Sequence, residues 1–170
     1  MGNSKSSRGF LKKSGKRLKK RVRNYTFKQS VVLQRSKEVQ LFIEIIRNQC
    51  RRCKVSLILA NSSSLGKQGG GDLLGFFQQP GRGRGMIKVA TRNIPIEDWI
   101  LTLAHEYAHF LQWFNNDPIY NLSDKQYIEL EIETEKQTSK LLKRFRIPLS
   151  QDYFNLKSKM YIQRLKKNAV

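Results

Sequence analysis

The sequence is poor in acidic residues, histidine and cysteine, and it contains no long hydrophobic run. Its 170 residues include 13 Asp plus Glu, 2 His and 2 Cys, against 33 Lys plus Arg. No apolar stretch reaches the roughly 20 residues that a membrane-spanning helix needs, and no apolar signal-peptide core follows the basic start. We therefore expect a soluble, intracellular protein.

The shortage of cysteine limits the chemistry that thiols can supply. Cys50 and Cys53 form a single C-R-R-C pair, which is half of a four-cysteine zinc site. The pair also lacks the sequence context of a thioredoxin motif. We interpret both residues as ordinary reduced thiols.

Positive charge is concentrated at the N-terminal end of the sequence. The formal net charge is +20, and residues 1–30 include no acidic side chain. This segment is rich in Ser, Gly, Lys and Arg and has no hydrophobic period. We predict a flexible basic arm at residues 1–29 and one domain at residues 30–170, a length that suits a single core.

Three roles are open for this arm. It can be a solvated tail without a target, or it can bind nucleic acid non-specifically by neutralising phosphates. The third role is membrane contact, because the first six residues, MGNSKS, fit the pattern for N-myristoylation of Gly2. One acyl chain together with a polybasic segment can hold a protein on an anionic membrane, which would make it peripherally membrane-associated.

Hydrophobic periodicity predicts an α+β domain with a small mixed or antiparallel sheet. The Ser- and Gly-rich residues 61–71 are expected to form a flexible loop, and PGRGRG at residues 80–85 to turn a hairpin. A capping box of Ser123 and Gln126 opens one of the helices. The expected helices are 31–47, 96–115, 124–146 and 151–167, and the expected strands are 55–60, 73–79 and 86–90.

Both histidines lie in one short stretch, LAHEYAHFLQW, at residues 103–113. His105 and His109 are four residues apart on the predicted helix 96–115, so their imidazoles project from the same side and can bind one metal ion. Glu106 is one step further round the helix. The alternative is that the two histidines are core residues whose polar atoms are satisfied within the protein.

A hydrolytic zinc site needs three protein ligands and one open position. Since the chain has no further histidine, the three-histidine sites of metzincins and Spartan-like proteases are excluded. Cys50 or Cys53 could complete a deformylase-like site, but the glycine and cysteine motifs that accompany such sites are absent. A carboxylate is the remaining kind of ligand.

The helix 124–146 offers two candidate carboxylates. At about 100° per residue, Glu131 and Glu135 point into the apolar arc of this helix, whereas Glu129 and Glu133 fall on the opposite side. Burying a carboxylate among aliphatic side chains is unfavourable unless a cation or hydrogen-bond donors meet it. We predict that Glu131 is the third zinc ligand and that Glu135 orients a histidine. Pairing with Lys143 or Arg144 is the alternative.

HEYAH, followed by a helical E-x-x-(small)-(acidic) motif at residues 131–135, resembles the gluzincin metallopeptidases. The similarity covers residues 86–142 and is greatest to small single-domain peptidases of phages and mobile elements and to the core of CAAX-type proteases. It implies that His105, His109 and Glu131 bind Zn²⁺ and that Glu106 is the general base. Thr134 stands where the family usually has alanine, and Glu135 where it has aspartate or asparagine.

The resemblance implies a zinc-dependent peptidase that hydrolyses peptide bonds of a protein or peptide substrate with a zinc-activated water. In that family the substrate usually adds a strand to a sheet edge above the zinc. We expect this edge to be Met86, Ile87, Lys88, Val89 and Ala90. The oxyanion stabiliser is left open among Tyr107, Tyr120 and Tyr127.

The charge supports an alternative function of a different class. The chain can be a basic, nucleic-acid-associated structural or packaging protein whose metal site is degenerate or non-catalytic. The two hypotheses differ in what residues 1–29 do, because the arm carries the function only in the second.

Overall fold

The computed structural model describes residues 37–68, 71–81, 83–116, 122–147 and 149–168. Contacts divide the chain into residues 1–40 and residues 41–170. In the first unit only residues 37–40, the opening turn of a helix, are described, so the fold below is that of the second. The predicted arm with Gly2, and its boundary to the domain at residue 30, lie outside the described residues.

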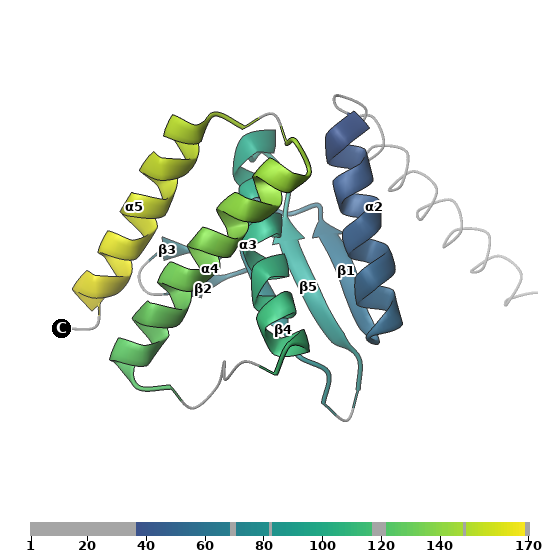
Figure 1. The fold of residues 1–170 in the computed structure, drawn as a ribbon, viewed down its shortest axis with the longest axis horizontal. Coiled ribbons are helices and arrows are strands. Elements are labelled where there is room, and N and C mark those ends of the chain that lie inside the picture. Colours follow the sequence, from purple (N-terminus) through teal and green to yellow (C-terminus); the bar gives the residue numbers. More distant parts are fainter. Residues whose placement is uncertain (1–36, 69–70, 82, 117–121, 148, 169–170) are drawn as a thin grey trace, which may run out of the picture. The chain divides into compact units, whose positions relative to one another are not determined.

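Helices and a small mixed sheet form an α+β fold, as predicted (Figure 1). None of the helices in the described ranges is both long and apolar enough to cross a membrane. The elements are α2 (Lys37–Arg52), β1 (Val55–Ala60), β2 (Lys67–Gln68), β3 (Gly71–Asp72), β4 (Gly75–Gln78), β5 (Gly85–Ala90), α3 (Ile96–Phe114), α4 (Asp124–Arg144) and α5 (Gln151–Asn168).

The main sheet has the strand order β1-β5-β4. β5 runs parallel to β1 and antiparallel to β4, and the β4–β5 pairing confirms the predicted hairpin. The prediction that Met86, Ile87, Lys88, Val89 and Ala90 form a sheet edge is wrong. They lie in the central strand, with a neighbouring strand on each side, and β4 is the outer strand next to α3.

One face of the sheet is buried beneath α3. Ile87 and Val89 of β5 are fully buried, whereas the alternate residues Met86 and Lys88 are half-buried. This alternation is expected because successive side chains of a strand point to opposite faces. α3 contacts β4 and β5 on one side and α4 on the other, so it is the central helix (Figure 1).

The ends of the helices agree closely with the prediction except in α2. Instead of ending near residue 47, α2 continues to Arg52, which brings Cys50 into the core. It stops before Lys54, whose φ of 57° is in the left-handed region typical of helix ends. The capping box at α4 is present as predicted, with Ser123 and Gln126 bonded reciprocally.

Residues 61–71 were expected to be a loop without regular structure. β2 and β3 instead pair antiparallel over two residues each. The ladder extends to Leu65 and Leu73, because the N–H of Leu65 donates to the carbonyl of Leu73 at 2.8 Å. Composition alone indicated a loop, since Ser and Gly favour turns, but backbone pairing between two strands needs no particular side chains.

Candidate metal centre

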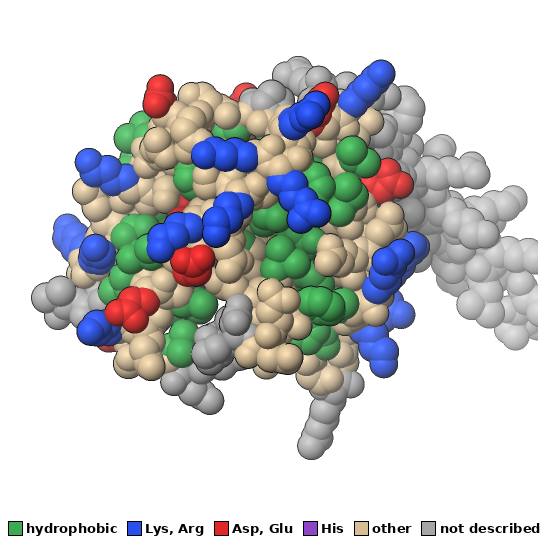
Figure 2. Space-filling view, in the orientation of Figure 1, with side chains coloured by type: hydrophobic (Ala, Val, Ile, Leu, Met, Phe, Trp, Pro, Cys, Tyr) green, Lys and Arg blue, Asp and Glu red, His purple; other side chains and the backbone are tan. Residues whose placement is uncertain are grey.

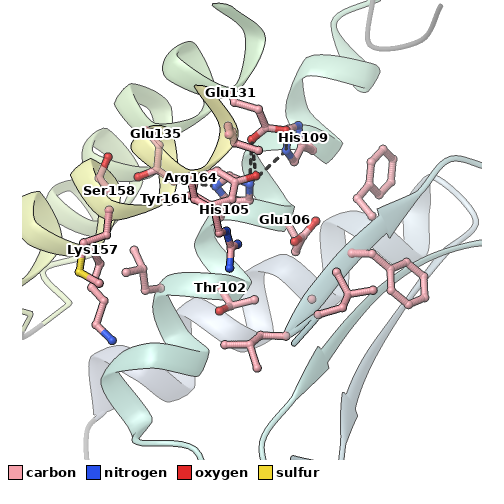
Figure 3. A pocket seen from close by; sticks show the side chains of 18 of the residues that line it. Thr102, His105, Glu106, His109, Glu131, Glu135, Lys157, Ser158, Tyr161 and Arg164 are labelled. Carbon is pink, nitrogen blue, oxygen red and sulfur yellow. Dashed lines mark hydrogen bonds and ion pairs between the residues drawn. The ribbon is translucent and has the colours of Figure 1, made fainter. Parts of the chain in front are cut away.

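α3 brings the two histidines together on the side that faces α4 and α5 (Figure 3). The Nε2 atoms of His105 and His109 are 3.2 Å apart, and the ring planes are nearly perpendicular at 82°. Their side chains are 13% and 14% exposed, so the pair is open to solvent only at one edge. The four-residue spacing places both rings on one face of the helix, as predicted.

Glu131 on α4 is the acidic residue that meets both rings. One of its oxygens is 3.3 Å from Nε2 of His105, and the other is 3.4 Å from Nε2 of His109. Its side chain is only 2% exposed. In the described part of the chain, His105, His109 and Glu131 form a group that could hold a metal ion. The sequence prediction named the same three residues.

Hydrogen bonding leaves this group with converging electron pairs. Nδ1 of His105 is 2.8 Å from Oε1 of Glu135, and Nδ1 of His109 is 3.0 Å from Oε1 of Gln112. A carboxylate or amide oxygen can only accept, so each Nδ1 carries the hydrogen. In neutral rings both Nε2 atoms then present lone pairs to one another and to Glu131. A cation, either a proton or a metal ion, is needed between them.

The contacts between the two imidazole nitrogens and the Glu131 carboxylate have lengths close to those in a zinc site. A tetrahedral ion with bonds of about 2.0–2.1 Å holds its ligand atoms about 3.3–3.4 Å apart. The two Nε2 atoms are 3.2 Å apart, and each lies 3.3 or 3.4 Å from a different oxygen of Glu131, so each of these contacts has about the length of one edge of such a tetrahedron. Two imidazole nitrogens and one carboxylate oxygen are also ligands that zinc commonly takes in hydrolytic sites.

When a proton is the cation, the charges of the group shift strongly. Burial lowers the pKa of His105, but hydrogen bonds to Glu131 and Glu135 outweigh it and raise that pKa to about 10. Burial raises the pKa of Glu131, but its hydrogen bonds with His105 and His109 hold that pKa well below its ordinary value. Without a metal ion, His105 and Glu131 therefore form a buried pair of opposite charges.

A chain of hydrogen bonds orients His109. Its Nδ1–H donates to Oε1 of Gln112, whose Nε2 donates to the hydroxyl of Thr134 at 3.0 Å. The hydroxyl in turn donates to the carbonyl of Leu130 at 2.9 Å. Gln112 and Thr134 are both buried. Sequence reasoning missed Gln112, although its position seven residues after His105 puts it on the same face of α3.

Glu106 lies on the other side of the histidines, between α3 and β4. Burial raises the pKa of its carboxyl, and the nearby His105 and His109 lower it by less. A backbone hydrogen bond from Phe77 of β4 reaches the carboxylate. Gly75 of β4 is so close that a Cβ there would lie 3.0 Å from Cγ of Glu106. The absence of a side chain at Gly75 lets the strand approach the helix.

The candidate centre lies at the wall of a cavity of about 800 Å³. β4 and the residues before it form one side, α3 forms the floor, and α4 and α5 form the other side. His105, Glu106, His109, Glu131 and Glu135 all line it, so the predicted site residues on α3 and α4 share one pocket (Figure 3).

α5 adds residues that the sequence analysis did not identify. The Tyr161 hydroxyl donates to Oε2 of Glu131 at 3.0 Å, and its ring lies edge-on to His105 with centroids 5.3 Å apart. Of the tyrosines left open as oxyanion stabilisers, Tyr127 lines the cavity. Tyr107 is buried against α2, where it bonds to Gln49, and Tyr120 lies outside the described residues. No local pattern shows which helix the face of α5 with Tyr161 will meet.

Comparisons of the chain with protein-family models, with curated proteins and with solved structures gave no significant match.

Proposed function

We propose that this chain is a zinc-dependent peptidase of the gluzincin type. The observation that carries the proposal is the convergence of His105 Nε2, His109 Nε2 and the Glu131 carboxylate, in which the two nitrogens are 3.2 Å apart and each lies 3.3–3.4 Å from one oxygen of Glu131. A buried group of this kind is unfavourable without a cation. Glu135 and Gln112 support the proposal, because they fix the ring hydrogens on the nitrogens that point away from the centre.

The chain's own groups suit peptide hydrolysis. Zinc bound there would polarise the scissile carbonyl and make a water acidic near neutral pH. In the proposed reaction Glu106 would take a proton from the attacking water and deliver it to the leaving amine, and burial, which raises its pKa, supports this role. The carbonyl carbon gains the hydroxyl and the amine nitrogen gains the proton as the C–N bond breaks.

β4 is the strand along which we propose that the substrate binds. The N–H of Ala90 donates to the carbonyl of Leu74 at 2.8 Å, so the alternate residues Gly75 and Phe77 direct their backbone groups away from β5. These groups border the cavity beside Glu106. A peptide added there as a further strand would place a carbonyl close to the centre.

Metal content tests the centre itself. The wild-type protein should retain about one zinc per chain after dialysis, and His105→Ala and Glu131→Gln should each lose most of it. Glu129→Gln is the matched control, because this residue lies on the exposed side of the same helix. Equal, metal-free preparations of all four proteins would refute the proposal.

Turnover tests the role of Glu106. Glu106→Gln should keep its zinc and lose hydrolysis of a peptide library by about 100-fold or more, as expected when a general base is removed. A variant that keeps both zinc and full activity would show that another group takes the proton.

Non-specific nucleic-acid binding is a second candidate function. Figure 2 shows Lys and Arg side chains over α4 and α5, and α4 contributes the exposed Lys136, Lys140, Lys143 and Arg144. Together with the net charge of +20, they provide the charge that phosphate contacts need. Deleting residues 1–29 should abolish retention on nucleic acid if the arm is the binding element, with zinc content as the control for folding.

A further inference from the structure

Two basic side chains line the cavity of the candidate centre, and both come from α5. Lys157 is neutralised by Asp98, with Nζ 2.8 Å from Oδ1. Arg164 has no carboxylate within 4.0 Å among the described residues. Its guanidinium carbon lies over the ring of Tyr161, 5.7 Å from the ring centroid. Arg164 is thus an exposed cation that lines the cavity and forms no ion pair with a described acid.

Most acids of the cavity have a partner or are exposed, although Oε2 of Glu135 has no hydrogen-bond partner among the described residues. Glu131 and Glu135 contact the histidines, and Glu106 accepts from the backbone of Phe77. Asp72 and Asp124 are exposed, and neither forms an ion pair with Arg164. Arg164 is therefore free of a carboxylate partner among the described residues, and a bound ligand can supply one.

Contacts with Tyr161 hold Arg164 near the centre. The Tyr161 hydroxyl is bonded to Glu131, its ring meets the ring of His105, and the guanidinium lies over that same tyrosine ring. Figure 3 shows Tyr161 and Arg164 beside the two histidines. Stacking on an aromatic ring restricts the arginine side chain, so less freedom is lost when it binds an anion.

We propose that Arg164 makes the centre select peptides that carry a carboxylate next to the scissile bond. The inference rests on the peptidase function proposed above. Residues of β4 and α5 line the same cavity, so a peptide bound along β4 would direct alternate side chains towards α5. The planar guanidinium can hold a carboxylate through two parallel hydrogen bonds. That carboxylate can belong to an Asp or Glu side chain or to a C-terminal residue.

Matched peptides test this selection. N-acetylated hexapeptides with a single Glu or Gln at each position in turn, each with a free or an amidated C-terminus, separate the two sources of carboxylate. For the zinc-loaded wild type, kcat/KM should be about 10- to 100-fold higher for the best Glu or free-carboxylate peptide than for its neutral twin, since a hydrogen bond to a charged group has that effect.

Variants of α5 assign the preference to one side chain. Arg164→Gln should abolish the preference for charged over neutral peptides while the neutral peptides are still cleaved, and Arg164→Glu should reverse it in favour of the neutral peptides. Lys167→Gln is the matched control, because Lys167 is an exposed base of α5 that does not line the cavity. If the wild type cleaves both peptides of each pair equally, the inference is overturned and the peptidase function stands.

A binding measurement keeps the two proposals separable. Zinc-loaded Glu106→Gln should bind the preferred charged peptide about 10- to 100-fold more tightly than the neutral one, and the additional change Arg164→Gln should remove that difference. Binding selectivity without any turnover by the wild type would support carboxylate recognition and refute the peptidase. Equal binding of charged and neutral peptides would refute carboxylate recognition.

Discussion

The amide nitrogen of Gln112 donates to the hydroxyl of Thr134 at 3.0 Å, in a buried contact that joins α3 to α4. Through it, the amide oxygen of Gln112 is turned towards Nδ1 of His109. Thr134 of α4 is thus matched by a glutamine on the facing helix. The pair positions a proposed zinc ligand without touching the ion.

We expect substitutions of Gln112 and of Thr134 to lower zinc affinity by different amounts. Gln112→Leu removes the acceptor for the His109 ring hydrogen, so zinc affinity should fall about 10- to 100-fold, the usual effect of deleting such a partner. Thr134→Val keeps the shape but removes the hydroxyl, and a smaller loss is expected. Competition with a chromophoric chelator measures both. Gln163→Leu, an exposed change on α5, should leave the affinity unchanged.

Zinc binding should be coupled to proton release. The pKa of His105 in the metal-free protein is about 10, so this ring is protonated at neutral pH and must lose its proton to bind an ion. The apparent zinc affinity should therefore rise about ten-fold per pH unit between about pH 6 and about pH 9. Calorimetry in buffers of different ionisation enthalpy should show about one proton released per ion. An affinity that is independent of pH would contradict this.

The stability of the metal-free protein should depend on pH through the same residue. Since the pKa of His105 is raised on folding, its stabilising effect is complete below the unfolded value of about 6.5 and is lost as pH rises through about 10. The melting temperature measured with a chelator should thus fall between about pH 7 and about pH 10. Glu131→Gln removes a partner of the ring, and its melting temperature should fall less over this range.

Gly75 should tolerate no side chain. A Cβ at this position would lie 2.5 Å from Cγ2 of Thr102 and 3.0 Å from Cγ of Glu106. Gly75→Ala must push β4 away from α3, which should lower the free energy of unfolding by about 1–3 kcal/mol, as overpacking commonly does. It should also reduce kcat/KM, because the backbone contact between Phe77 and Glu106 would be displaced.

Gly81→Ala is the control for that experiment. A Cβ at Gly81 meets nothing within 4 Å, so stability and turnover should match the wild type. Chemical denaturation and peptide hydrolysis measure the two quantities. If Gly75→Ala behaves like Gly81→Ala, the close approach of β4 to α3 is not required.

Local sequence patterns predicted much of the fold and of the site. The hydrophobic period placed α3 and α4 within two residues of their observed ends, and Ser123 with Gln126 marked the start of α4. The same period placed Glu131 and Glu135 on the inward side of α4, and both are buried there. These features are set by neighbours three or four residues apart, which the sequence displays directly.

The sequence by itself determined which side chains each helix presents on one face, including His105 and His109 on α3 and Glu131 on α4. Only the tertiary structure decided which faces meet: β5 is the central strand, Gln112 reaches Thr134, and α5 brings Tyr161 and Arg164 to the cavity. Periodicity fixes orientation about an element's own axis, whereas strand order and helix docking depend on pairing between segments far apart in the chain.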